Sequence, residues 1–97
     1  MAQSSNGKGK RLSAEELGKA ALNAVRELTG YQPESVTALE WDGEGELWDV
    51  KVDVLELARV PNTTDVIGEY VVKLDEAGKL HGYRRERRFQ RGQVSEA

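Results

Sequence analysis

The chain has 97 residues, of which 32% are charged and 38% hydrophobic, and its formal net charge at pH 7 is −3. This length predicts one small domain with a modest core and no second domain. The absence of cysteine excludes disulfides and thiolate metal sites, and it favours the cytoplasm over an extracellular compartment. Because no stretch approaches the roughly 18 apolar residues of a spanning helix, we expect no membrane partner.

The first predicted element is a helix over about residues 14–29. Residues 1–11 contain nothing to bury, so we expect a disordered arm there. Ser13 and Glu16 then form a capping-box pattern, apolar residues recur at helical spacing up to Leu28, and Gly30 supplies a stop. The small alanines of this stripe favour close packing on a sheet, and Gly18 suggests a tight contact beside them.

A strand over Leu47–Val60, with the sequence LWDVKVDVLELARV, is the centre of the predicted fold. Apolar residues fall on every second position from Trp48 to Val54, with charged residues between them. This alternation is typical of an antiparallel strand with a core on one side and water on the other. Glu56 then takes the core register, which predicts a bulge near Val54–Leu55, and Pro61 ends the strand.

Three further strands surround this one. The first runs to Trp41 and ends in an acidic hairpin loop at 42–46; simple alternation puts its Val36 and Leu39 on opposite faces. The third spans Val66–Asp75, and the fourth spans Lys79–Arg91. Because the loops are short, we predict an α+β fold: one N-terminal helix packed on a four-stranded antiparallel meander, in the order α-β-β-β-β. The domain would span 12–91, with a frayed tail at 92–97.

Charge is distributed unevenly along the chain. Between Glu34 and Glu76 there are 12 acidic and 3 basic residues, whereas from Lys79 onward there are 6 basic and 2 acidic residues. Four arginines lie on the last strand, and neither of its faces is fully apolar, so we expect it at a sheet edge. Strict alternation would divide its side chains into two sets: Tyr83, Arg85, Arg87 and Phe89 on one face, and Arg84, Glu86 and Arg88 on the other.

The residues alone leave three interpretations of these arginines open. They could pair with carboxylates of neighbouring strands and protect the edge from aggregation. They could form a docking face for an acidic partner protein, since arginine is enriched at binding hot spots. They could also bind nucleic acid with help from Tyr83 or Phe89, although the acidic remainder of the domain would repel a polyanion.

The sequence shows no sign of catalytic or metal chemistry. His81 is the only histidine, and no cysteine or nucleophile motif accompanies it. The acidic loop with Asp42, Glu44 and Glu46 lacks the spacing of an EF-hand. We therefore expect no enzyme activity, no cofactor and no bound metal.

Three stretches together resemble the gas vesicle protein O family: WDVKVDVLELARVP, DVIGEYVVKLDEAGKLHGYRR and the closing YRRERRFQR. The resemblance covers roughly Ala20 to Arg91, and Phe89 replaces a frequent tyrosine. It implies a cytoplasmic, gas-vesicle-associated accessory protein, not an enzyme, that helps to build gas vesicles by contacting shell or other accessory proteins. The expected partner-binding residues are Arg59, Tyr83, Arg85, Arg88, Phe89 and Arg91. We also expect the open sheet face opposite the helix to take part, since Leu39, Leu55, Leu57 and Val71 would make it partly apolar.

The alternative to this interpretation is a nucleic-acid-binding or regulatory module that uses the same arginines. We do not expect nucleic acid to be the partner, because the domain is acidic overall. The exposed edge of the predicted sheet leaves self-association into a homodimer open.

Overall fold

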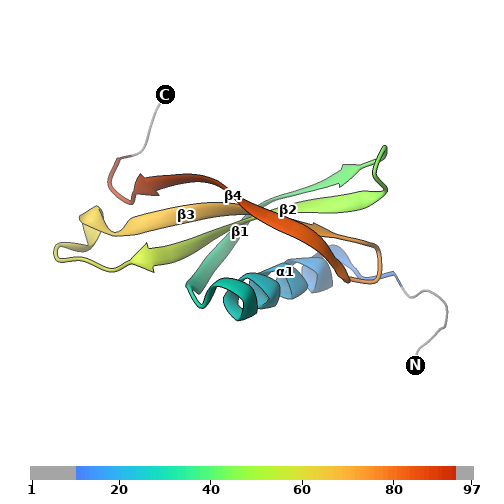
Figure 1. Cartoon of the computed structure of the whole chain (residues 1–97), viewed down its shortest axis with the longest axis horizontal. Coiled ribbons are helices and arrows are strands. Elements are labelled where there is room, and N and C mark those ends of the chain that lie inside the picture. Colours follow the sequence, from blue (N-terminus) through green and yellow to red (C-terminus); the bar gives the residue numbers. More distant parts are fainter. Residues whose placement is uncertain (1–10, 94–97) are drawn as a thin grey trace.

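The computed structural model describes residues 11–93, and within them one helix precedes a four-stranded antiparallel sheet (Figure 1). The strand order is β1-β2-β3-β4, which confirms the predicted α+β meander. Most of the expected arm at 1–11 and tail at 92–97 lies outside the described residues. The elements are α1 (Ala14–Thr29), β1 (Gln32–Asp42), β2 (Leu47–Leu57), the 3-10 turn η1 (Asn62–Thr64), β3 (Val66–Leu74) and β4 (Leu80–Gln90).

Local signals fix both ends of α1. The backbone N–H of Glu16 donates to Ser13 Oγ at 3.1 Å, and Glu16 Oε1 accepts from the backbone N–H of Ser13 at 2.9 Å, which is the predicted capping box. At the other end Gly30 adopts a left-handed φ of 79° and donates its N–H to the carbonyl of Arg26. The helix therefore begins and ends where the sequence predicts.

The core lies between α1 and one face of the sheet. Three residues on consecutive turns of the helix, Leu17, Ala21 and Val25, are almost completely buried. They pack on the apolar faces of the two central strands, and alternation predicted these faces correctly. The sheet residues of the core are Val50, Val52, Val54, Tyr70, Val72 and Leu74.

The helix is much shorter than the sheet. Sixteen residues of α-helix span about 24 Å, whereas the longest axis of the molecule measures 48 Å. Both ends of the sheet extend beyond α1, as Figure 1 shows. One of these ends carries the cross-strand pair Trp41 and Trp48, whose ring centroids lie 5.2 Å apart. Within residues 11–93 no helix is long and apolar enough to cross a membrane.

Bulges decide which side chains face the helix, and they correct two expectations. In β1 the register shifts between Val36 and Ala38, so that Val36 pairs with Val52 and Leu39 pairs with Val50. Both therefore lie on the helix side, and the predicted alternation was wrong here. In β2 the shift lies between Leu55 and Leu57, close to the expected place, and Glu56 faces the same side as the core. This strand ends at Leu57 and not at the predicted Val60, because the chain leaves the sheet for the loop that contains Pro61.

Replacing Gly18 with alanine should stabilise the protein by about 0.5–1 kcal/mol, because glycine inside a helix is less favourable than alanine by this amount. A Cβ at Gly18 would lie 3.5 Å from Val36 Cγ2, an ordinary contact, so the tight packing expected at this glycine is absent. Urea unfolding of Gly18→Ala measures the change. The control, Gly30→Ala, should lose stability because its φ is positive. A loss in Gly18→Ala would instead show that the helix cannot accept a methyl group against β1.

Candidate functional site

A bulge in β4 reverses which face of the sheet the second half of this strand presents its side chains to. The register shifts opposite Glu69 and Tyr70, so that Arg85 pairs with Tyr70 and Arg88 pairs with Gly68. Arg85 and Arg88 therefore share the helix side of the sheet, whereas strict alternation placed them on opposite faces. The same shift puts Arg87 on the opposite face, across from Glu69. The structure thus brings together two of the predicted binding arginines in an arrangement that the simple pattern missed.

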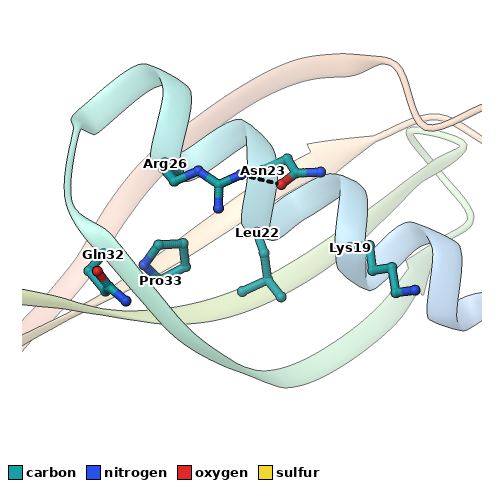
Figure 2. Close-up of a pocket in the computed structure, with 6 residues that line it drawn as sticks. All are labelled: Lys19, Leu22, Asn23, Arg26, Gln32 and Pro33. Atoms are coloured by element: carbon teal, nitrogen blue, oxygen red, sulfur yellow. Dashed lines mark hydrogen bonds between the residues drawn. The ribbon is translucent and has the colours of Figure 1, made fainter.

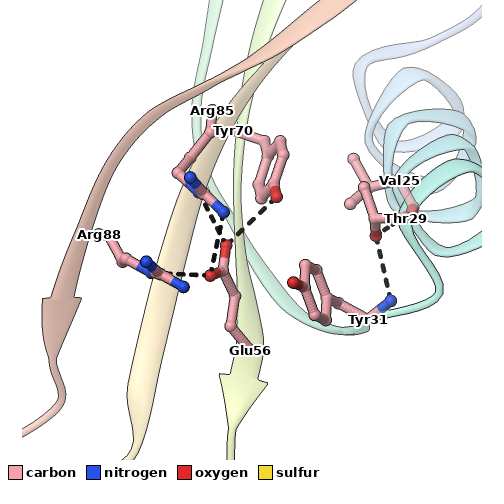
Figure 3. Close-up of polar contacts among 7 residues, drawn as sticks. All are labelled: Val25, Thr29, Tyr31, Glu56, Tyr70, Arg85 and Arg88. Atoms are coloured by element: carbon pink, nitrogen blue, oxygen red, sulfur yellow. Dashed lines mark hydrogen bonds and ion pairs between the residues drawn. The ribbon is translucent and has the colours of Figure 1, made fainter.

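The carboxylate of Glu56 joins these two arginines (Figure 3). Its Oε2 accepts from Arg85 Nε at 3.1 Å and from the hydroxyl of Tyr70 at 3.2 Å, and its Oε1 accepts from Arg88 Nε at 3.0 Å. The side chain of Glu56 is only 1% exposed, whereas those of Arg85 and Arg88 are 40% and 55% exposed. The carboxylate is therefore enclosed, and the guanidinium groups that enclose it still reach water.

The charges in this cluster do not cancel. A buried carboxylate is tolerated only when it is paired and hydrogen-bonded, and one arginine would neutralise Glu56. A second arginine leaves one unit of positive charge at the surface. Hydrogen bonding to Glu56 raises the pKa of Arg85, and burial together with the Glu56 charge raises the pKa of Tyr70. Both partners therefore keep their protons at neutral pH, and the network stays intact.

Gly68 provides the space for Glu56. A Cβ added at Gly68 would overlap the carboxylate of Glu56, with its Cδ only 2.7 Å away. Glycine is needed here because a side chain crosses directly over the backbone of β3. The position of Glu56 on β2 therefore depends on glycine at position 68 of β3.

Exposed apolar side chains continue this surface along β4. Tyr83 is 41% exposed, and its ring lies 6.2 Å from that of Tyr70. Leu80 is also exposed, because α1 packs mainly on β1, β2 and β3. We call this surface the β4 patch and define it as Leu80, Tyr83, Arg85 and Arg88.

The other three predicted binding residues lie elsewhere. Arg91 donates two hydrogen bonds to Glu34, at 2.8 and 3.1 Å, and two to Asp65 Oδ2. Arg59 contacts the same Asp65 only by donating its backbone N–H to the carboxylate. This hydrogen bond, together with the hydrogen bonds and charge of Arg91, lowers the pKa of Asp65. Phe89 lies on the face opposite the helix, with the guanidinium of Arg87 4.7 Å from its ring centroid. Arg91 therefore ties the start of β1 to the loop before β3.

The face of the sheet opposite α1 is not the open apolar surface that the sequence suggested. Leu39 faces the core instead, and Val71 is buried to 2% exposure. Ion pairs lie over this face, joining Lys73 to Asp49 at 2.8 Å and Arg87 to Glu69 at 2.9 Å. The four residues Leu39, Leu55, Leu57 and Val71 therefore do not form an exposed apolar surface on this face, since Leu57 alone of them is exposed.

Asp53 is a carboxylate on this same face whose burial and nearby negative charge outweigh the attraction of Arg87. Its Oδ1 is buried without a hydrogen-bond partner in the described part of the chain, and Glu69 lies directly opposite on β3. Burial raises the pKa of Asp53, and the negative charge of Glu69 raises it further. Ionisation of Asp53 at neutral pH therefore opposes folding.

A hollow beside α1 has no catalytic character. It has a volume of about 330 Å³ and lies between the helix and the start of β1 (Figure 2). Its wall contains two cations but no carboxylate, histidine or hydroxyl, and Arg26 there donates to Asn23 Oδ1 at 2.8 Å. His81 lies at the β3–β4 turn and pairs with Asp75 at 3.0 Å. Across residues 11–93 no three acidic or histidine side chains are grouped to hold a metal ion. The residues that line the hollow are Lys19, Leu22, Asn23, Arg26, Gln32 and Pro33.

Comparison with known proteins gives a consistent family assignment. The family model described as "Gas vesicle synthesis protein GvpO" matches residues 1–95. Gas vesicle protein O of a Streptomyces species is 47% identical over 74 residues, which cover 76% of this chain and 56% of that protein. Gas vesicle protein O1 of Halobacterium salinarum is 37% identical over 76 residues, covering 78% of this chain and 62% of that protein.

A third relative, gas vesicle protein O of Haloferax mediterranei, is 36% identical over 76 residues, covering 78% of this chain and 54% of that protein. The match therefore spans little more than half the length of these curated relatives. No solved structure matches the chain.

Gly68→Ala should destabilise the protein by about 2–3 kcal/mol, because the new methyl group expels the Glu56 carboxylate from its place between the arginines. Chemical unfolding measures the change. Gly82→Ala is the matched control: it lies on β4, and a Cβ there would meet nothing within 4 Å. Equal stability of the two variants would contradict the close approach of Glu56 to β3.

Asp53→Asn should stabilise the protein at pH 7 by about 0.5–1 kcal/mol, a figure that allows for solvent screening of a partly exposed group. Because the folded-state pKa of Asp53 is raised above its ordinary value of 3.8, the wild type loses stability as the pH rises through that folded-state pKa. The advantage of the variant should therefore disappear below about pH 3.8. Unfolding curves at several pH values test this. Asp49→Asn, which loses an ion pair to Lys73, should show no such gain.

Proposed function

Because the chain belongs to the gas vesicle protein O family, we propose that it is an accessory protein that helps to build gas vesicles by binding other gas vesicle proteins. In this proposal it is a cytoplasmic, gas-vesicle-associated adaptor and not an enzyme. Its binding surface is the β4 patch, on the helix side of the sheet, and the partner presents carboxylates to it.

The observation that carries the proposal is the excess charge around Glu56. Two guanidinium groups share one buried carboxylate, so the β4 patch keeps one positive charge that no residue among 11–93 neutralises. Arg88 uses only its Nε in the described structure, which leaves the outer N–H groups of its guanidinium for a ligand. A charge-assisted hydrogen bond to such a group contributes about 1.5–3 kcal/mol.

Glu56 also prepares the arginines for binding. A free arginine loses side-chain entropy when it is ordered, about 2 kcal/mol for full immobilisation. The bonds to Glu56 fix Arg85 and Arg88 before any partner arrives, so less of this cost remains at binding. Tyr83 adds an exposed ring beside them, and arginine and tyrosine together are typical of binding hot spots.

Nucleic acid has less support as the partner. The arginines of β4 are mostly tied to carboxylates: Arg85 and Arg88 to Glu56, and Arg87 to Glu69. These pairs lower the positive potential that a phosphate backbone would meet, and the net charge of the chain is −3. A partner with a few placed carboxylates suits the patch better than a polyanion does.

Arg88→Ala should abolish or strongly reduce gas vesicle formation when it replaces the wild-type chain in a gas-vesicle-producing host. The variant removes the more exposed arginine and leaves Arg85 and Tyr70 to hold Glu56, so the fold should survive. Vesicles are counted by electron microscopy and by flotation, and circular dichroism of the purified variant checks folding.

Arg87→Ala is the matched control, since it also removes one arginine and one ion pair from β4 but on the opposite face. It should leave vesicle formation close to normal. Normal vesicles from a folded Arg88→Ala chain, or equal loss in both variants, would contradict binding at the β4 patch.

A further inference from the structure

The two edges of the sheet carry opposite charge. Strand β1 contains three acidic residues and no lysine or arginine, whereas β4 contains four arginines and one glutamate. Each of these strands pairs with one neighbour only, so each has a row of backbone groups without a strand partner. The sheet therefore has one acidic edge and one basic edge.

The opposite charges of the two edges favour one way of pairing two copies of the chain over the others. Two β1 edges would bring carboxylates together, and two β4 edges would bring arginines together, so both symmetric pairings are repelled. A β4 edge beside the β1 edge of another copy joins opposite charges. In an antiparallel meander of four strands β1 and β4 run in opposite directions, so this addition also continues the antiparallel pattern.

Two charged residues are left for such a contact. Glu40 on β1 and Arg84 on β4 are both exposed, and neither has an ion pair or hydrogen bond through its side chain within residues 11–93. Glu40 lies opposite Asp49 and Arg84 lies opposite Val71, which places both on the face away from α1. Side by side in a joined sheet, they would form an ion pair between copies.

The helix side of the same edges supplies apolar contact. Trp41 on β1 is 44% exposed and Tyr83 on β4 is 41% exposed, and each adjoins one of the two free charges in sequence. Aromatic pairs across neighbouring strands stabilise a sheet by up to about 1 kcal/mol. An ion pair on one face and an aromatic pair on the other would thus hold the two edges together.

Prolines and bulges, which block pairing at a sheet edge, lie outside the segments of β1 and β4 that carry Glu40 and Arg84. Pro33 and both bulges of β1 lie before Ala38, and the pairing of 38–42 with β2 is regular. On β4 the pairing of 82–85 with β3 is regular as well, between two shifts of register. A short ladder fits this combination, and a short ladder favours weak, concentration-dependent association.

We propose that a second copy of this chain docks edge to edge, with Leu39–Asp42 of one copy paired to Gly82–Arg85 of the next. The contact is head to tail, so it leaves a free edge at each end and forms open chains of copies instead of closed two-fold dimers. The proposed contact shares Tyr83 and Arg85 with the β4 patch, but it concerns the sheet edges, and its test uses the purified chain alone and so does not depend on the gas vesicle role.

Sedimentation velocity of the purified chain tests it. At roughly 0.02 M salt the average mass should rise with concentration beyond that of a dimer, and at roughly 0.5 M salt, where exposed charges are screened, the rise should be much weaker. Glu40→Arg and Arg84→Glu should each weaken association about tenfold. Glu27→Arg, an exposed reversal on α1, is the control with the same charge change and should behave like the wild type.

Charge swapping makes the test specific. The double variant Glu40→Arg with Arg84→Glu should associate again, and so should a mixture of the two single variants. Circular dichroism of each variant checks that the exposed substitutions leave the fold intact. Three results would overturn the proposal: a monomer at low salt over the whole concentration range, association that both single variants retain, or mass growth that stops at a dimer.

Discussion

Glu56 is the carboxylate on which the organisation of β4 depends. Its position in the core register of β2 places a charge where the pattern calls for an apolar side chain, and such a charge is tolerated only with close partners. The partners come from two other strands: Tyr70 on β3, and Arg85 with Arg88 on β4. Gly68 opens the path across β3 that lets them meet. One carboxylate thus joins side chains from three strands that are far apart in the sequence.

The same interaction gives the two faces of the sheet different characters. On the helix side the charges gather into one cluster with an excess positive charge, next to the exposed ring of Tyr83. On the opposite side the charges are spread as separate cross-strand pairs, and Asp53 is left over. Separate surface ion pairs contribute little binding free energy, whereas most of the binding free energy of an interface comes from a few clustered residues. This asymmetry is the reason for placing the proposed binding surface on the helix side of β4.

Sequence periodicity predicted the elements well, and it failed where a single extra residue changes the facing of a strand. The stripe of α1 and the alternation over the middle of β2 and β3 are uninterrupted, so the ends of α1 and the buried faces of these elements followed directly from residues such as Ser13, Val52 and Tyr70. The bulges near Thr37 and Glu86 have no local signature, because they arise from the fit of the edge strands to their neighbours. The pairing of Glu56 with Arg85 and Arg88 was missed for the same reason. The available signal was Glu56 in a core register. A buried carboxylate requires cationic partners, but the sequence does not show which residues these are.

The placement of the two tryptophans has a practical consequence for spectroscopy. The only indoles of the chain, Trp41 and Trp48, are stacked at a tilt of 59° on adjacent strands near the acidic hairpin. Coupled transitions between two such rings give an exciton signal in the ultraviolet, which is lost as soon as the hairpin opens. Emission and the exciton band therefore report on one end of the sheet, whereas amide hydrogen exchange in α1 reports on the helix. Comparing the two separates local fraying of the hairpin from global unfolding.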